Sequence, residues 1–168
     1  MLPPWPGWDG LHPLIVHFPI GLLIVAPLFV LLALVAPRHA KGFEISALVL
    51  LALGVIAAFV AVSTGKAAGE LAEHTETINA VLERHEGLAE TTRNLFAVLT
   101  VLYAALLALP SWVVRASRPA YRTAVNVVVL VLLLGGNLLL ANAAHQGARL
   151  VHQFGVHAMM PVAPPAKE

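Results

Sequence analysis

The sequence predicts an all-α polytopic membrane protein built as a four-helix transmembrane bundle. Of its 168 residues, 59% are hydrophobic and 11% are charged, whereas soluble domains have about 45–50% apolar and about 25% charged residues. Four apolar segments also reach the roughly 20 residues that a helix needs to cross the hydrocarbon core. The spans are expected at about 14–36, 43–62, 95–114 and 124–144.

Three breaks separate these spans. Residues 37–42 and 110–119 form short turns that contain proline, which lacks the backbone donor a helix needs. The middle break, 63–94, is longer and strongly charged. Because no second apolar core or linker is visible, residues 1–160 are interpreted as one transmembrane domain, and the Pro/Ala-rich residues 161–168 as a flexible C-terminal tail.

The middle break is expected to hold an amphipathic helix on the outer face, between helices two and three. His74, Ile78, Val81, His85 and Leu88 recur at alternating steps of four and three, which places them on one stripe of a helix. The glutamates of this segment fall largely off that stripe. The pattern therefore predicts that both histidines turn toward the bundle.

The distribution of lysine and arginine predicts the orientation. Five of the ten basic residues lie in or beside the two short turns, and the other five are spread over the middle break and the chain ends, among many glutamates. Dense positive charge in short loops marks the cytoplasmic side. The short turns are therefore placed inside, and both termini and the middle break outside.

Histidines are concentrated on the predicted outer face. The chain has eight histidines, and His39 is the one expected inside. The others are His12, His17, His74, His85, His145, His152 and His157. Polar groups at membrane depth tend to be functional, so imidazoles from three chain segments are expected to meet in a shallow pocket. The alternative is that they are interfacial side chains without a ligand, and His12, just before a proline, is interpreted as a helix-start residue.

Neutral imidazole is a ligand for haem iron, copper and zinc. A four-helix bundle offers apolar slots for haem b, and ligands at a single face predict one haem near the outer surface. Three imidazoles would instead suit copper or zinc, with Glu73 or Glu86 as an added ligand. The absence of cysteine excludes disulfides, c-type haem attachment and thiolate-held iron–sulfur clusters. A net charge of +1 does not favour a nucleic-acid partner.

Several motifs resemble a known family. Residues 12–21, His-Pro-Leu-Ile-Val-His-Phe-Pro-Ile-Gly, resemble the opening of the bacterial membrane-protein family called domain of unknown function 2231. Ser-Thr-Gly at 63–65 and His-Glu at 85–86 are similar to that family as well. Residues 147–156 resemble the pattern that ends its fourth helix, with His152 where tyrosine is usual.

The resemblance implies four spans in the bacterial inner membrane. Domains similar to this one occur fused to Rieske-type or cytochrome-type modules, which implies a redox role by analogy. Taken position by position, the matching motifs single out His17 and His85, and His145 precedes the fourth motif. His17, His85 and His145 are therefore the first expected ligands, for haem or for copper or zinc, followed by His152 and His74.

We therefore expect a haem b-binding electron-transfer protein with its histidine site near the periplasmic face. Its expected partners are the lipid bilayer and a periplasmic redox protein or a quinone. Two alternatives stay open, a copper- or zinc-binding membrane protein and a non-catalytic accessory subunit of a larger membrane complex. Assembly into a homo-oligomer or a larger complex stays open as well. No substrate-transforming centre is visible, so independent enzymatic activity is not expected.

Overall fold

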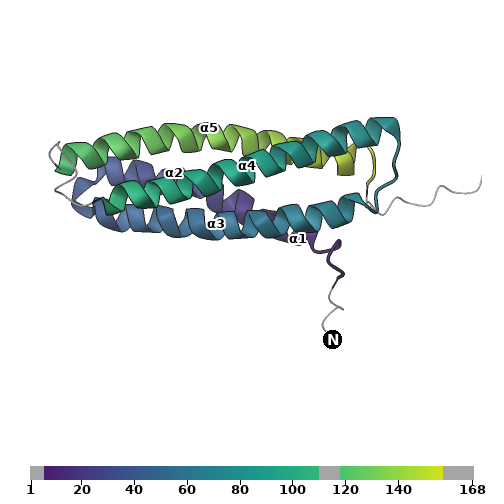
Figure 1. The fold of residues 1–168 in the computed structure, drawn as a ribbon, viewed down its shortest axis with the longest axis horizontal. Coiled ribbons are helices and arrows are strands. Elements are labelled where there is room, and N and C mark those ends of the chain that lie inside the picture. Colours follow the sequence, from purple (N-terminus) through teal and green to yellow (C-terminus); the bar gives the residue numbers. More distant parts are fainter. Residues whose placement is uncertain (1–5, 110–117, 157–168) are drawn as a thin grey trace, which may run out of the picture.

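The computed structural model describes residues 6–109 and 118–156 and has four long helices running up and down in turn (Figure 1). The elements, in chain order, are α1 (His12–Ile15), α2 (His17–Val35), the 3-10 turn η1 (Pro37–His39), α3 (Ala40–Gly69), α4 (Glu76–Ala108) and α5 (Arg118–His152). The described residues contain no strand. The all-α four-helix prediction is confirmed. Residues 161–168, expected to be a flexible tail, lie outside the described residues.

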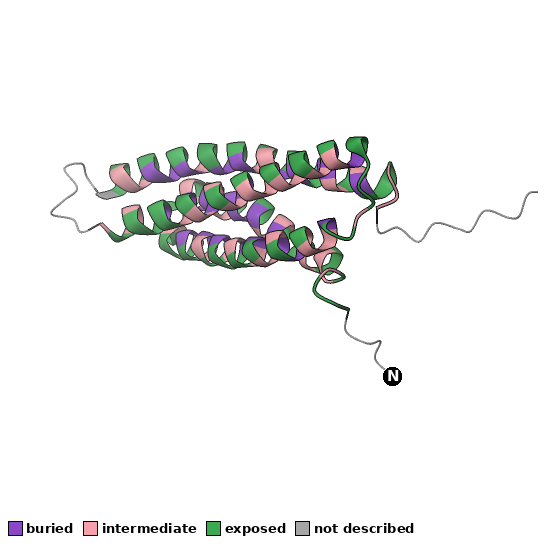
Figure 2. Ribbon diagram, turned by 45° about the vertical axis from the view of Figure 1, so that its right-hand side comes forward, coloured by how far each residue is buried: buried purple, intermediate pink, exposed green. Residues whose placement is uncertain are grey.

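All four long helices are apolar enough to cross a membrane. The candidate spans are His12–Val35, Pro37–Gly69, Glu76–Ala108 and Pro119–His152. In the most apolar 18-residue stretch of each span, no more than 33% is buried inside the protein. Figure 2 shows the buried residues on the sides that the helices turn toward one another, with exposed residues around the outside. A helix that is apolar on all sides is stable only when lipid surrounds its outer face, so the chain is embedded in a membrane.

The core lies along the axis between the helices. Its fully buried members include Leu23, Val30, Leu51, Phe96 and Leu133, which come from all four long helices. Large apolar side chains such as those at 101 and 138 are exposed on the outside. One stripe of each helix is therefore buried between the helices, and the remaining apolar residues face the lipid.

The amphipathic segment is placed differently from the prediction. It is the first half of α4 and not a separate helix, because nothing interrupts the backbone hydrogen bonding between Glu76 and Ala108. Thr75 caps the helix by accepting a hydrogen bond from the Ile78 backbone N–H at 3.3 Å. At 33 residues the helix is about 50 Å long, so it projects beyond a hydrocarbon core of about 30 Å. The stripe faces inward at Ile78 and Val81, which are buried against Leu150, and at the partly buried His85. The prediction is wrong for His74, which precedes the helix and is exposed.

The first span is broken close to its beginning. Val16 separates α1 from α2, and Pro13 and Pro19 stand in the first turns of the two helices, where proline is tolerated. The short helix α1 packs on α3. This packing places the His12 side chain, at the start of α1, against α3.

A buried polar cluster connects three helices near the end that carries the short turns. The Glu44 carboxylate, 2% exposed, forms an ion pair with Arg122 and accepts a hydrogen bond from Asn126 Nδ2 at 2.9 Å. The Tyr103 hydroxyl donates to Asn126 Oδ1 at 2.8 Å. Because a buried carboxylate requires compensation, this network fixes the register of α3, α4 and α5 at that end.

Candidate functional site

A cavity of about 430 Å³ lies near the end of the bundle that carries α1, the last turns of α5 and the α3–α4 connection. Every long helix contributes to its wall, together with α1. Small residues make up much of this wall: Ala58, Ala61, Gly65, Ala89, Ala143, Ala144, Gly147 and Ala148. The volume falls within the range of about 300–1,000 Å³ found for small-molecule and cofactor sites. The wall is mostly apolar, with a few polar groups that converge from different helices.

His12 is the first of these polar groups, and its ring is held by α3. Its Nδ1 lies 3.0 Å from the Ala61 carbonyl oxygen and 3.3 Å from Thr64 Oγ1. A carbonyl oxygen only accepts hydrogen bonds, so Nδ1 must carry the proton and donate it. The neutral ring then has its lone pair on Nε2, the atom that a metal would bind.

His85 repeats this arrangement from the opposite side. Its Nδ1 lies 2.8 Å from the carbonyl oxygen of Ala143 in α5, so Nδ1 again carries the proton. With Nδ1 as the donor, Nε2 is the ring nitrogen of His85 that could bind a metal. Metal-binding histidines in proteins commonly donate their other ring N–H to a backbone carbonyl or carboxylate, which fixes tautomer and orientation. Both imidazoles are held in this way by the protein itself, without a ligand.

A glycine four residues after each carbonyl lets the ring approach the helix. A Cβ added at Gly65, four after Ala61, would lie 2.8 Å from His12 Cε1. A Cβ added at Gly147, four after Ala143, would lie 2.9 Å from His85 Cε1. Residues four apart lie one above the other on a helix face, so any side chain at either glycine would displace the imidazole. The two histidines thus share one local design: a carbonyl acceptor and a glycine one turn later.

The His12 and His85 rings both line the cavity and lie edge to face beside each other. Their centroids are 6.4 Å apart and their planes make an angle of 77°. A metal ion held between two Nε2 atoms on opposite sides would separate the centroids by about 6.4 Å, since each metal–nitrogen bond is about 2.0–2.1 Å and each nitrogen lies about 1.2 Å from its ring centre. The centroid separation of His12 and His85 is therefore large enough to admit one metal ion between two imidazoles.

The structure brings together some of the predicted ligands and not others. His17, His85 and His152 line the cavity, with His17 and His152 exposed at its margin. His145 is exposed on α5 and does not line it. His74 precedes α4, where its Nδ1 bonds Asn79 Oδ1 at 2.8 Å, beside a separate groove. His157 lies outside the described residues.

Sequence reasoning missed His12, which it assigned to a helix start. The residue does begin α1, but its ring also occupies the cavity. The missed signal was a pair of matching spacings, Ala61 to Gly65 and Ala143 to Gly147. In each pair, two small residues one turn apart leave room on the helix surface for a histidine ring from a neighbouring segment. Among the described residues, no group of three or more histidine, aspartate or glutamate side chains is placed to hold a metal ion.

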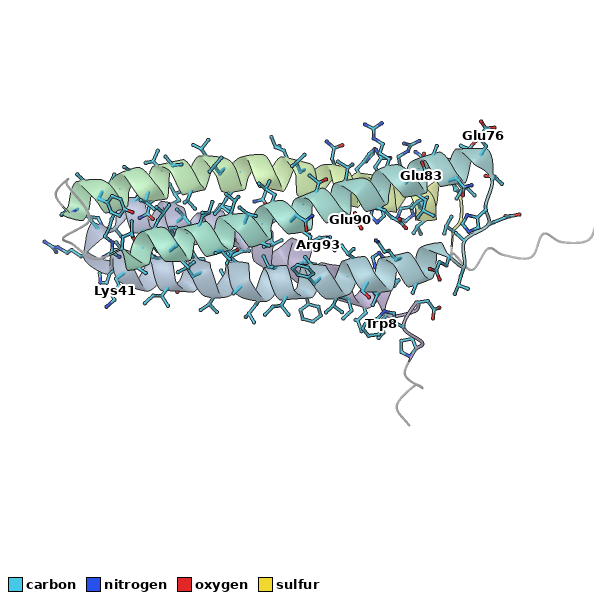
Figure 3. The ribbon with its side chains drawn as sticks, in the orientation of Figure 1. Trp8, Lys41, Glu76, Glu83, Glu90 and Arg93 are labelled. Carbon is cyan, nitrogen blue, oxygen red and sulfur yellow. The ribbon has the colours of Figure 1, made fainter. Side chains whose placement is uncertain are left out.

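The α3–α4 side of the cavity carries charge. Lys66 and Arg93 line it together with Glu86. The Lys66 ammonium lies 2.6 Å from Glu90 Oε1, and the Arg93 guanidinium stacks 4.8 Å from the centre of the Phe59 ring. Figure 3 shows Glu90 and Arg93 on the part of α4 that runs beside α3.

Comparison with known proteins identifies the family. A family model with the description "Predicted membrane protein (DUF2231)" matches residues 9–160. The chain belongs to this family. The resemblance inferred from the sequence motifs is confirmed, and the four spans agree with the family's description as a membrane protein. No curated protein and no solved structure matches the chain.

Proposed function

We propose that the protein binds one haem b between His12 and His85 and transfers electrons at the membrane surface. The observation that carries the proposal is the pair of imidazoles, each with its Nδ1 proton bound to a helix carbonyl and with ring centroids 6.4 Å apart. His12 and His85 would hold the haem iron through their Nε2 atoms. When bound, haem would supply a one-electron redox centre.

The composition of the cavity supports a flat, apolar ligand. Alanine and glycine dominate the faces that α3 and α5 turn toward the cavity, so a macrocycle would meet few side chains that have to move. The surrounding helices would exclude water from the ring and hold both imidazoles in one tautomer. A bare copper or zinc ion has less support, because proteins usually give zinc at least three ligands and no such group is preformed among the described residues.

The site's location suits electron exchange with a surface partner. It lies toward the end of the bundle from which α4 projects beyond the hydrocarbon core. The density of basic residues in the short turns favours placing this end outside the cytoplasm. In the bacterial inner membrane, which the family resemblance implies, the site would then be open to a periplasmic redox protein or to quinone.

Visible spectra test the proposal directly. The full chain, purified in detergent and supplied with haem, should show reduced and oxidised spectra typical of two axial imidazoles, and metal analysis should find iron. His12→Ala and His85→Ala should each abolish that spectrum. His145→Ala is the matched control on α5, because His145 is exposed and away from the cavity.

Two results would overturn the proposal. One is a colourless wild-type protein that takes up no haem, which would favour the accessory-subunit alternative. The other is a spectrum that survives loss of His12 or His85 but not loss of His145. Copper or zinc in the metal analysis, with no haem uptake, would favour a metal-binding protein.

A further inference from the structure

Two cations stand on the α3–α4 side of the haem cavity. Lys66 and Arg93 both line it, from α3 and α4 respectively. Glu86 is the one acidic residue among the described lining residues, and Glu90, which pairs with Lys66, lies outside the lining. An apolar cavity with positive charge on one side fits a ligand that is apolar over most of its surface and anionic at one edge.

A ligand carboxylate could replace Glu90 as the ion-pair partner of Lys66. Its salt bridge to Glu90 joins two side chains that are 52% and 38% exposed, and exposed ion pairs contribute little to stability. Glu90 itself does not line the cavity. A ligand carboxylate that reached Lys66 could therefore replace Glu90 with little loss. Arg93 stacks on Phe59 and donates from Nε to Asn94 Oδ1 at 3.1 Å, and its remaining guanidinium N–H groups suit a carboxylate.

Thr92, beside Arg93, lines the same cavity and has a buried hydroxyl without a hydrogen-bond partner. The residue is 3% exposed. Other helical hydroxyls behave differently: Ser46, Thr64 and Thr100 each donate to the carbonyl four residues before. Buried polar atoms without partners are rare in proteins, and each calls for an explanation. A rotation of the Thr92 side chain toward the cavity that it lines would let a ligand atom accept a hydrogen bond from its hydroxyl.

From these observations we infer that Lys66, Thr92 and Arg93 form an anion subsite for the two propionate carboxylates of the haem. The inference rests on the proposed haem function and goes further by assigning the cofactor's orientation in the cavity. The propionate edge would lie toward α3 and α4, with two cations opposite two carboxylates and the Thr92 hydroxyl as an added donor. Pairing the carboxylates is necessary because anionic groups at membrane depth are costly when uncompensated.

A comparison of haem with haem dimethyl ester isolates the carboxylates. Both ligands have the same macrocycle and iron, but the ester has no charge on its side chains. The full-length protein would be titrated with each in neutral detergent free of phospholipid, so that no lipid phosphate competes. Wild type should bind the free acid about tenfold or more tightly than the ester, as charge-assisted hydrogen bonds are among the stronger polar contacts.

Variants assign that preference to residues. Lys66→Met and Arg93→Gln should each lower the affinity for the free acid about tenfold, while leaving the ester nearly unchanged. Thr92→Val keeps the shape of the side chain and should reduce the acid preference to a smaller extent. Arg84→Gln is the matched control, since Arg84 is an exposed cation of α4 that does not line the cavity.

The outcomes separate the subsite from the proposed function. If wild type binds acid and ester equally, the subsite is wrong while haem binding stands. Equal losses in Arg84→Gln and Arg93→Gln would also reject it, since the effect would then come from overall charge. If neither ligand binds, the haem proposal fails and the subsite fails with it. A preference for the acid that Lys66→Met and Arg93→Gln both remove would support the assignment.

Discussion

Replacing Gly147 by alanine tests the way α5 positions His85. The added Cβ would lie 2.9 Å from His85 Cε1, whereas carbon atoms in contact prefer about 3.5–4.0 Å. The ring must therefore withdraw by about 0.6–1.1 Å. That shift lengthens the hydrogen bond of 2.8 Å from Nδ1 to the Ala143 carbonyl, which sets the tautomer and the direction of Nε2.

Gly147→Ala should weaken haem binding without lowering the stability of the ligand-free protein. Outer-shell changes at metal-binding histidines typically cost about 10- to 100-fold in affinity, so Gly147→Ala should lower haem affinity by about that factor. Alanine in place of glycine inside a helix favours folding by about 1 kcal/mol, so the ligand-free protein should not lose thermal stability through the helix itself. Gly65→Ala should act in the same way on His12, where the added Cβ lies 2.8 Å from Cε1.

Absorbance titration with haem measures the affinity, and circular dichroism on heating measures the stability of the ligand-free protein. Gly87→Ala is the matched control, because a Cβ there meets nothing within 4 Å although Gly87 lies only two residues after His85. Wild-type haem affinity in Gly147→Ala would refute the reasoning. So would an equal loss in Gly87→Ala, because the effect would then not depend on contact with the ring.

Two further predictions concern the opposite end of the bundle and its orientation. Arg122→Met leaves the buried Glu44 without its ion-pair partner and should lower the free energy of unfolding in detergent by about 3–5 kcal/mol. An equal effect of Arg84→Met, which removes an exposed cation, would contradict this expectation. The chain has no cysteine, so single cysteines at Lys41 and Glu76, which lie at opposite ends (Figure 3), report topology cleanly. A membrane-impermeant thiol reagent added to intact spheroplasts should label Glu76→Cys and not Lys41→Cys, and the reverse pattern would invert the proposed orientation.

Hydropathy predicted the number of helices because lipid imposes a simple requirement. Every backbone polar group in the hydrocarbon core must be satisfied within a helix or a closed barrel, so a run of about 20 apolar residues leaves few alternatives. The helix ends were harder to predict. α3 continues to Gly69 and α4 begins at Glu76, so both helices extend well into the segment interpreted as a break. Charged residues mark where the chain lies outside the hydrocarbon core, but they do not end a helix.

The ligand set shows where sequence reasoning stopped. His145 and His12 both belong to the outer end, but only the packing of the helices decides which side chain points inward. On α5, Ala143 and Gly147 face the cavity, and His145, two residues after Ala143, is turned about 200° away on a helix of 3.6 residues per turn. His12 contacts α3 through the Ala61 carbonyl, and hydropathy gives no indication of that contact.

By itself, the sequence determined the membrane class, the four spans, the family motifs and the concentration of histidines at one end. All of these follow from composition and from positions along one chain. Only the tertiary structure decided that His12 and His85 form a pair at the cavity, since the two residues lie 73 positions apart (85 − 12) and each ring is fixed by a carbonyl on a third or fourth segment. A hydrogen bond across helices depends on their relative rotation and depth, and those are set by how all the buried side chains pack together.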